Sequence, residues 1–272
     1  MNITFLGQGA MGSRMADRLA AAGHAVRRWN RTGATESPST AVKDADFVFA
    51  MLRDDAAAHS VWLDSETGAL RGMRSGALAV DFSTLSPRGF AALHEAAINA
   101  GIAMLDAPVL GSRPQAELGQ LIHLVGGTDA DFATIQPILA TMSAAQHHVG
   151  PAGTGAALKL VANALFGVQV ALVAELFGKM RSLGLAPAAA FDLLGQTPVL
   201  SPAAKGAGSL MLAGRNDPLF PVELVAKDFG YVLGEQAATM PVTLAAAQLF
   251  DRALARGLGD ANLTAVARLY DS

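Results

Sequence analysis

The chain has 272 residues, a length that suits one large domain or two smaller ones. Hydrophobic residues make up 51% of it and charged residues 16%, a composition that excludes an intrinsically disordered chain. The formal net charge is −3 and no basic block stands out, so neither nucleic acid nor an anionic membrane is expected as a partner. The absence of cysteine excludes disulfides, zinc–thiolate sites and cysteine nucleophiles, and it fits the cytoplasmic location that we expect.

The first half of the chain alternates short apolar runs with helical patterns. Strands are predicted at residues 3–6, 25–29, 46–52, 77–82, 103–107 and 121–125, and helices at residues 12–22 and 87–100. Strands that alternate with helices predict an α/β domain, in which a mostly parallel sheet carries helices on both faces.

The pattern changes at the segment Gly150-Pro151-Ala152-Gly153. No convincing strand follows it, and helices are predicted at residues 155–183, 187–194, 221–237, 242–257 and 262–270. The most apolar stretch, residues 160–176, contains Asn163, Gln169 and Glu175, so we expect a helix buried on most sides rather than a membrane span. The sequence therefore predicts an α/β domain over residues 1–152 and an all-α domain over residues 153–272, joined by the long helix.

A glycine-rich loop lies between the first predicted strand and the first predicted helix, and it consists of Gly7, Gln8, Gly9, Ala10, Met11 and Gly12. In this setting the pattern G-x-G-x-x-G supplies a tight turn, a close approach of the backbone to a pyrophosphate, and helix amides that face its negative charge. The loop therefore predicts a Rossmann dinucleotide-binding domain; the alternative is an ordinary tight turn. Met51 and Leu52, which end the third predicted strand, are expected to contact the same cofactor.

The end of the second predicted strand bears on the choice between NAD and NADP. A site for NAD places a carboxylate there to accept a hydrogen bond from the ribose 2′-hydroxyl. This chain instead has Asn30, Arg31 and Thr32, and the Arg31 guanidinium can pair with a 2′-phosphate. We therefore expect NADP(H) to be favoured over NAD(H), with a solvated surface arginine as the alternative.

Two polar pairs in the second half are candidates for the chemistry. Lys159 and Asn163 are four residues apart on the long predicted helix, so they share a face in an otherwise apolar stretch. An ammonium there can polarise a carbonyl and give up a proton as hydride arrives; the alternative is a lysine that reaches the solvent from a surface. The second pair, Lys227-Asp228, lies either on a solvated helix face or in a cleft, and its spacing does not decide between them.

Five segments in this order resemble the β-hydroxyacid dehydrogenase family, which includes 3-hydroxyisobutyrate dehydrogenases. They are the glycine loop with the segment Trp29–Thr32, the segment Asp81–Thr84, the segment Asp106–Ser112, the segment Gly153–Asn163 and the pair Lys227-Asp228. The segment Arg113–Leu121 and Phe220 look like the glyoxylate/succinic-semialdehyde reductase branch.

The resemblance implies a role for each matched residue. Lys159 would be the general acid in reduction and the general base in oxidation, and Asn163 would orient the substrate and the lysine. Thr84 would lie beside both nicotinamide and substrate, and Lys227 would reach the nicotinamide end of the cofactor. The remaining predicted substrate-binding residues are Leu110, Gly111, Ser112, Phe220 and Asp228.

Leu110 departs from the family pattern, which usually has a serine whose hydroxyl helps to hold the substrate carboxylate. Leucine cannot donate a hydrogen bond, and losing one to a charged group costs about 1.5–3 kcal/mol. Either the Gly111 and Ser112 amides or the Ser112 hydroxyl replace it, or the preferred substrate is more apolar. The family's usual substrates are therefore not transferred to this chain.

The main hypothesis is a reversible NADP(H)-dependent oxidoreductase of small β-hydroxyacids and the corresponding aldehyde or keto acids. An imine reductase and a non-catalytic NADP-binding protein on the same scaffold are the alternatives, and 6-phosphogluconate dehydrogenase is disfavoured by the length of the chain. No metal is expected, and His147-His148 is expected in a solvated turn. A homo-oligomer, dimer or tetramer, is expected because the C-terminal half is short and apolar.

Overall fold

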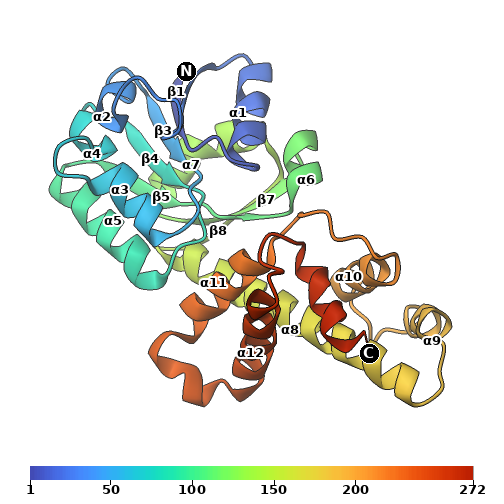
Figure 1. Ribbon diagram of the computed structural model, residues 1–272. Helices are drawn as coiled ribbons and strands as arrows, with labels where there is room; N and C mark the ends of the chain where they lie inside the picture. Colours follow the sequence, from blue (N-terminus) through green and yellow to red (C-terminus); the bar gives the residue numbers. More distant parts are fainter. Residues whose placement is uncertain (272) are drawn as a thin grey trace. The chain divides into compact units, whose positions relative to one another are not determined.

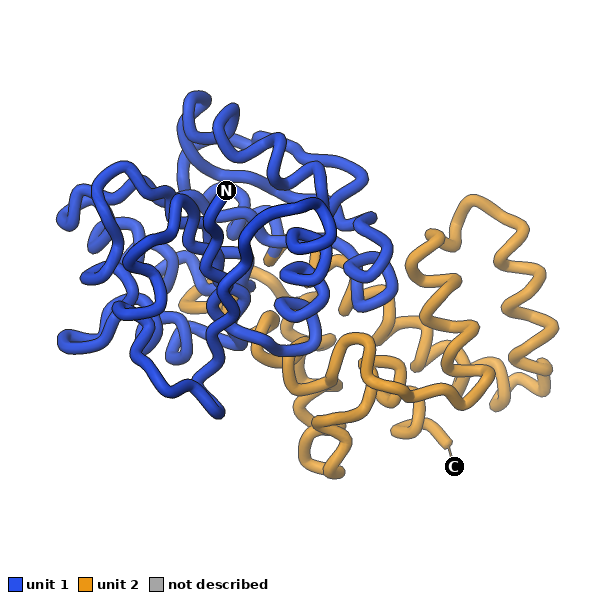
Figure 2. The backbone as a smooth tube through the Cα atoms, turned by 90° about the horizontal axis from the view of Figure 1, so that it is seen from above, with its two compact units in different colours: residues 1–159 blue, residues 160–272 orange. Residues whose placement is uncertain are grey.

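The computed structural model describes residues 1–271 and consists of two compact units (Figures 1 and 2). Unit 1 is Met1–Lys159 and unit 2 is Leu160–Ser272. The division falls inside the long helix α8, Thr154–Ser182, whose first residue follows the predicted boundary at residues 152 and 153.

Unit 1 contains one eight-stranded sheet. Its strands are β1 (Asn2–Leu6), β2 (Ala25–Trp29), β3 (Phe47–Ala50), β4 (Leu78–Asp81), β5 (Ala103–Asp106), β6 (Val109–Leu110), β7 (Leu121–Gly126) and β8 (Ser143–Gly150). Strands β2-β1-β3-β4-β5 are parallel in that order, β7 is antiparallel to β5 and β6, and β8 is parallel to β7. The chain moves from β1 to opposite sides for β2 and β3, so a topological switch point lies at the carboxyl end of β1.

Both faces of the sheet are buried, as expected of a parallel sheet with helices on either side. Ile3, Phe5 and Phe49 point into one core, which helices α1, α6 and α7 cover. Leu6 and Val48 point into the other core, which helices α2, α3, α4 and α5 cover. The helices are α1 (Gly12–Ala21), α2 (Pro38–Ala41), α3 (Asp55–Leu63), α4 (Ala69–Gly72), α5 (Pro87–Asn99), α6 (Arg113–Leu118) and α7 (Asp129–Leu139). The predicted α/β architecture is confirmed.

The structure corrects the sequence prediction at the far edge of the sheet. Residues 143–150 form strand β8, and His147 and His148 lie in it rather than in a solvated turn. The His148 ring stacks on Phe132 at 5.0 Å between centroids, and its Nε2 lies 2.9 Å from the Gly127 carbonyl oxygen. The strand escaped prediction because its sequence has neither an apolar run nor a regular alternation.

Unit 2 contains helices and, among the described residues 160–271, no strand beyond an isolated bridge between Pro221 and Asn262. It comprises most of α8 together with α9 (Pro187–Leu194), α10 (Pro202–Leu212), α11 (Val222–Leu233) and α12 (Pro241–Ala255), and the 3-10 helices η1 (Gly234–Thr239) and η2 (Leu263–Tyr270). The predicted helix over residues 221–237 ends early, because Gly234 has a positive φ of 43°.

Helix α8 packs on one side only. Val170, Ala174 and Phe177 are buried in the cores of unit 2. Leu165 and Leu172, by contrast, are 62% and 53% exposed, so the predicted burial on most sides is wrong. Of the helices in residues 1–271, only α8 is long and apolar enough to cross a membrane by length and composition, and half of its most apolar stretch is buried.

Candidate cofactor and catalytic site

The three glycines of the loop after β1 occupy three different environments. Gly7 has a φ of +92°, and a Cβ there would lie 2.3 Å from the Met51 carbonyl oxygen. A Cβ on Gly12 would lie 2.2 Å from the Gly7 carbonyl oxygen, so this glycine lets α1 pack against the loop. Gly9 is exposed, and apart from its two chain neighbours no atom of residues 1–271 lies within 4 Å of its Cβ position. Gly7 and Gly12 thus shape the turn, and Gly9 leaves open space above the backbone.

The residues around Gly9 fit a bound pyrophosphate. Helix α1 begins without a side-chain cap at Met11, so no side chain competes with an anion for its first amides, of which the Ser13 amide donates to the Gly9 carbonyl oxygen at 3.1 Å. The Gln8 side chain folds back and donates to the carbonyl oxygens of Phe5 and Gly7, and Arg14 donates to that of Ala10. These hydrogen bonds stabilise the conformation of the loop through its carbonyl oxygens, and they leave the space beside Gly9 to the ligand.

Arg31 differs from the neighbouring arginines in having no ion-pair partner among the described residues. Arg27 pairs with Glu36 and Arg28 with Asp17, both at 2.7 Å. Exposed Arg31 follows β2 between exposed Asn30 and Thr32, and within residues 1–271 it forms no ion pair. Its guanidinium is therefore available to a ligand at the edge where the glycine loop lies.

A buried carboxylate organises the loops after β3 and β4. Asp81, which ends β4, accepts hydrogen bonds from Trp62 Nε1 at 2.7 Å and from the Ser83 amide at 2.8 Å. The Ser83 hydroxyl in turn accepts one from the Leu52 amide at 2.8 Å. Burial raises the pKa of Asp81, while these donors lower it. The network fixes half-buried Met51, Leu52 and Thr84 at the carboxyl edge of the sheet.

The segment after β5 holds the predicted substrate-binding residues of unit 1. Leu110 is half-buried in β6 and pairs with Ile122 of β7. Gly111 has a φ of +120°, and Ser112 is the N-cap residue immediately before α6. Ser112 and Gln115 form a reciprocal capping box, in which the Ser112 amide donates to Gln115 Oε1 at 2.9 Å. The Ser112 amide and hydroxyl therefore both form hydrogen bonds that cap α6.

Unit 2 brings Asn163, Lys227 and Asp228 together. The Asn163 amide nitrogen donates to Asp228 Oδ2 at 2.6 Å, linking α8 to α11. Lys227 Nζ lies 3.2 Å from Asp228 Oδ1 and 4.9 Å from the centroid of the Tyr231 ring. Asp228 and Asn163 are only 4% and 8% exposed, so this is a buried polar network rather than a solvated helix face.

Lys159 lies one turn before Asn163 on α8 and is half-buried. The four-residue spacing places both side chains on one face of the helix. Phe220 is partly buried against the core of unit 2, and its amide donates to Asn262 Oδ1 at 3.0 Å. The predicted residues thus divide into a cofactor group in unit 1 and a polar network in unit 2. Lys159 is the last residue of unit 1 and lies on α8, which continues into unit 2.

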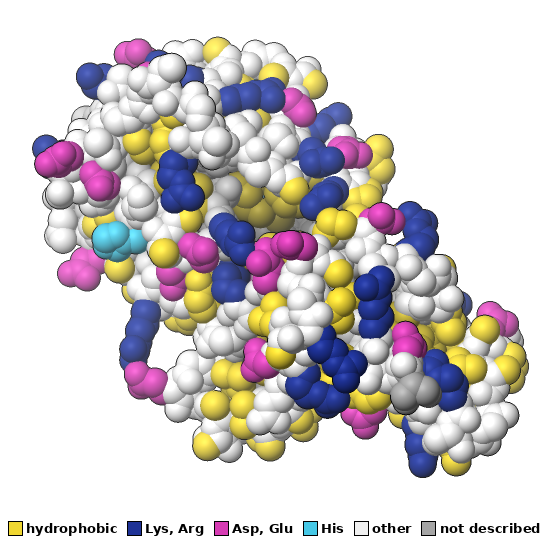
Figure 3. All heavy atoms as spheres, viewed as in Figure 1, with side chains coloured by type: hydrophobic (Ala, Val, Ile, Leu, Met, Phe, Trp, Pro, Cys, Tyr) yellow, Lys and Arg dark blue, Asp and Glu magenta, His cyan; other side chains and the backbone are white. Residues whose placement is uncertain are grey.

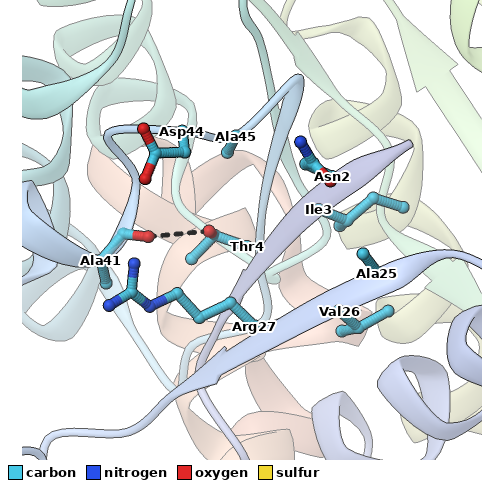
Figure 4. A pocket seen from close by; sticks show the side chains of 9 residues that line it. All are labelled: Asn2, Ile3, Thr4, Ala25, Val26, Arg27, Ala41, Asp44 and Ala45. Carbon is cyan, nitrogen blue, oxygen red and sulfur yellow. Dashed lines mark hydrogen bonds between the residues drawn. The ribbon is translucent and has the colours of Figure 1, made fainter.

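A hollow in unit 1 lies away from the glycine loop. It has a volume of about 400 Å³, and Asn2, Ala25, Arg27 and Asp44 are among the residues that line it (Figure 4). Asn2 and Ala25 are the first residues of β1 and β2, whereas dinucleotides bind beyond the carboxyl ends of such strands. Inside the hollow, Thr4 donates to the Ala41 carbonyl oxygen at 2.9 Å. This hollow is therefore not the cofactor site.

Sequence reasoning overlooked two kinds of residue. Tyr231 lies four residues after Lys227 on α11, so helical spacing alone could have indicated their contact. The roles of Trp62 and Ser83 depend on contacts over 19 to 31 residues, which no local pattern reveals. No cluster of potential metal ligands occurs in the part of the chain that the structure describes.

Comparisons with known proteins match nearly the whole chain. Residues 2–150 match the family model of the NAD binding domain of 6-phosphogluconate dehydrogenase. Residues 153–270 match that of the NAD-binding region of NADP-dependent 3-hydroxyisobutyrate dehydrogenase. The chain is 33% identical to glyoxylate/succinic semialdehyde reductase 1 of Arabidopsis thaliana, over 98% of this chain and 97% of the relative.

Solved structures share the fold. Mycobacterium tuberculosis 3-hydroxyisobutyrate dehydrogenase with L-serine has a TM-score of 0.89 at 29% identity, covering 100% of this chain and 99% of the other. An imine reductase from Myxococcus stipitatus in complex with NADP+ has a TM-score of 0.60 at 21% identity, covering 98% and 99%. The second likeness is one of fold alone.

Proposed function

Because this chain belongs to the β-hydroxyacid dehydrogenase family and is an NAD(P)-dependent oxidoreductase, we propose that it is an NADPH-linked reductase of small aldehyde or keto acids. The reverse reaction would be the oxidation of β-hydroxyacids. The observation that carries the proposal is the buried Asn163–Asp228–Lys227 network, with Lys159 one turn away on the same helix as Asn163.

The chain's own residues supply the proton and the orientation, while the nicotinamide supplies the hydride. Lys159 stabilises negative charge on the carbonyl oxygen and donates a proton to it, which makes the alcohol. Asp228 holds the Asn163 amide by accepting from its nitrogen, so the amide oxygen remains to accept a hydrogen bond from the lysine or a substrate hydroxyl. A positioned general acid contributes typically ~10²–10⁴-fold to the rate.

NADP(H) is the proposed cofactor because the three residues directly after β2 include no carboxylate and Arg31 lacks an ion-pair partner among residues 1–271. A charge-assisted contact with the 2′-phosphate is worth about 1.5–3 kcal/mol, or roughly ten- to a hundredfold in affinity. Arg31→Leu should weaken NADPH binding by that factor and leave NADH binding unchanged, as fluorescence titration of both cofactors would measure. Arg28→Leu is the matched control.

The test of the reaction is the rate of NADPH oxidation over a panel of small aldehydes and keto acids, repeated with NADH. We expect an NADPH-preferring substrate that bears a carboxylate. Lys159→Met should keep NADPH binding and lose at least ~10²-fold in turnover, because the proton donor is removed. Lys179→Met, which removes an exposed lysine from the same helix, should retain turnover.

Three results would contradict the proposal. Near wild-type turnover by Lys159→Met would show that Lys159 is not the proton donor. Reduction of a cyclic imine without activity on any aldehyde or keto acid would favour the imine reductase. Tight NADPH binding without activity on the whole panel would favour a non-catalytic NADP-binding protein.

A further inference from the structure

Asp106, the last residue of β5, has a carboxylate that faces the start of helix α8. Its Oδ1 accepts a hydrogen bond from the Gly153 amide and its Oδ2 accepts one from the Ala156 amide, both at 2.6 Å. The residue is only 1% exposed. A buried carboxylate that accepts hydrogen bonds from two amides at a helix N-terminus satisfies two of the four otherwise unpaired donors there. Its negative charge also interacts favourably with the helix dipole.

The surrounding backbone is packed too closely for this carboxylate to shift. A Cβ on Gly126 of β7 would lie 2.3 Å from Asp106 Oδ1. A Cβ on Gly155 would lie 2.8 Å from Oδ2 and 2.2 Å from the Leu124 carbonyl oxygen. Ala156 is itself buried in a core of unit 1. The first turn of α8 is therefore pressed directly against the carboxyl edge of β5 and β7.

The origin of this cap sets α8 apart from other helices of the chain. Helices α2, α3, α5, α7 and α10 are capped by the residue that immediately precedes each helix, namely Ser37, Asp54, Ser86, Thr128 and Ser201. The donors to Asp106 lie 47 and 50 residues further along the chain. A local cap stabilises a helix wherever the helix lies, whereas a cap from a distant strand also fixes its position against the sheet.

We propose that Asp106 is a positioning residue that acts through Lys159. Its carboxylate fixes the first turn of α8 on the sheet of unit 1, and Lys159 follows Ala156 by three residues on that helix. A slide or rotation of the first turn moves the ammonium by a similar amount, and a misplacement of about 1 Å can cost roughly 10²-fold in rate. The inference rests on the proposed function, in which Lys159 donates the proton.

The first test is Asp106→Asn, which keeps the size of the side chain but offers only one acceptor to the two amides. We expect kcat to fall by roughly 10- to 100-fold. The dissociation constant of NADPH should remain unchanged, because the glycine loop follows a different strand. Hydrogen exchange at residues 153–156 should accelerate. Asp64→Asn is the matched control, since Asp64 accepts from the Glu66 and Thr67 amides at an exposed turn.

The second test is a double-mutant cycle with Lys159→Met. If Asp106 acts through the lysine, adding Asp106→Asn to Lys159→Met leaves the residual turnover unchanged. A merely structural role would lower turnover by the same factor in both backgrounds, and that result would overturn the inference. If Asp106→Asn does not fold, Asp106→Ser, which also retains one acceptor, takes its place in both tests.

The outcomes separate this inference from the function on which it rests. Wild-type turnover by Lys159→Met overturns the proposed function and, with it, the role given to Asp106. An inactive Lys159→Met beside an Asp106→Asn variant of wild-type kcat overturns this inference alone. Unchanged exchange at residues 153–156 in Asp106→Asn would likewise show that the carboxylate does not hold the helix.

Discussion

Leu110 stands at the position where the family pattern described above usually has a serine. The Ser112 amide and hydroxyl, which the sequence offered as replacements for a missing serine hydroxyl, are engaged in the capping box of α6. We predict that Leu110→Ser lowers the KM for a carboxylate-bearing aldehyde such as glyoxylate by roughly ten- to a hundredfold, with little change in kcat. The reason is that one hydrogen bond to a charged group is worth about 1.5–3 kcal/mol.

An uncharged aldehyde of similar size is the control for this substitution. Its KM should not fall, because it has no carboxylate to accept the new hydrogen bond. A parallel change in KM for both substrates would show that Leu110 acts through the shape of the site. Steady-state NADPH oxidation by the wild-type and variant proteins measures both values.

His123 links the stability of unit 1 to pH. It is fully buried in β7, with Nδ1 3.2 Å from the Ala107 carbonyl oxygen, and burial lowers its pKa from 6.5 to about 4. As the pH falls below 6.5, the unfolded chain binds a proton that the folded chain does not, so stability is lost between about pH 6.5 and 4. His123 should therefore lower the free energy of unfolding by about 2 kcal/mol between pH 7 and pH 5. We predict that His123→Gln, which cannot titrate, abolishes this contribution.

Asp106 acts on stability with the opposite sign. Burial raises its pKa from 3.8 to about 6, although the hydrogen bonds from the Gly153 and Ala156 amides lower it. As the pH falls, the folded chain therefore binds a proton before the unfolded chain does, and this stabilises the folded state. Asp106 therefore partly masks the effect of His123 in the wild type. Urea unfolding at pH 7 and pH 5 should show that His123→Gln is stabilised relative to the wild type as the pH falls. An equal difference between the two proteins at both pH values would disprove the assignment.

At the scale of elements, apolar runs predicted the central strands well. The predictions for β1, β2, β3, β4, β5 and β7 each lie within two residues of the observed strand at either end. Strand β8 and the two-residue β6 were missed, because hydrogen bonding to β7 defines them and their own sequences carry little pattern. Short helices such as α2 and α4 were missed for the same reason, since four residues are too few for a helical period to appear.

The candidate site was predictable where residues act locally. The glycine loop and the Lys159–Asn163 spacing follow from a motif and a helical period. The bond from Asn163 to Asp228 spans 65 residues, and those from α8 to Asp106 span 47 and 50. Such contacts depend on the tertiary fold, so the sequence could identify Asp106 within a segment but could not indicate what its carboxylate holds.

The glycine loop provides a matched pair of substitutions at the element scale. In Gly7→Ala the new Cβ meets the Met51 carbonyl oxygen and the residue keeps an unfavourable positive φ, so the protein should be destabilised. In Gly9→Ala the Cβ meets nothing, so stability should stay within about 1 kcal/mol of the wild type. NADPH affinity, however, should fall tenfold or more, because the methyl group occupies the space left for the pyrophosphate.

Urea unfolding and fluorescence titration with NADPH measure the two properties separately. A Gly9→Ala variant that binds NADPH as tightly as the wild type would show that the pyrophosphate does not bind at this loop. A Gly7→Ala variant of unchanged stability would contradict the close approach to Met51.

At the scale of the whole molecule, the surface pattern bears on self-association. On the face seen in Figure 3, Lys and Arg side chains are interspersed with Asp and Glu, and no single sign of charge dominates. Apolar side chains also reach the surface along α8, where Leu158, Val161, Leu165, Leu172 and Leu176 are each at least 40% exposed. Leu158, Leu165 and Leu172 are spaced by seven residues, which keeps them on one face of the helix.

We predict that this face of α8 forms the interface of a homo-oligomer, since a row of exposed leucines is costly to leave in water. Light scattering at micromolar concentration should give the mass of a dimer or tetramer. Leu165→Glu combined with Leu172→Glu should shift the protein toward the monomer, because two charges would be buried at the interface without partners. Leu118→Glu, at a leucine of α6 that is 63% exposed, should leave the mass unchanged. A wild-type monomer would refute the prediction, and an unchanged oligomer in the double variant would place the interface elsewhere.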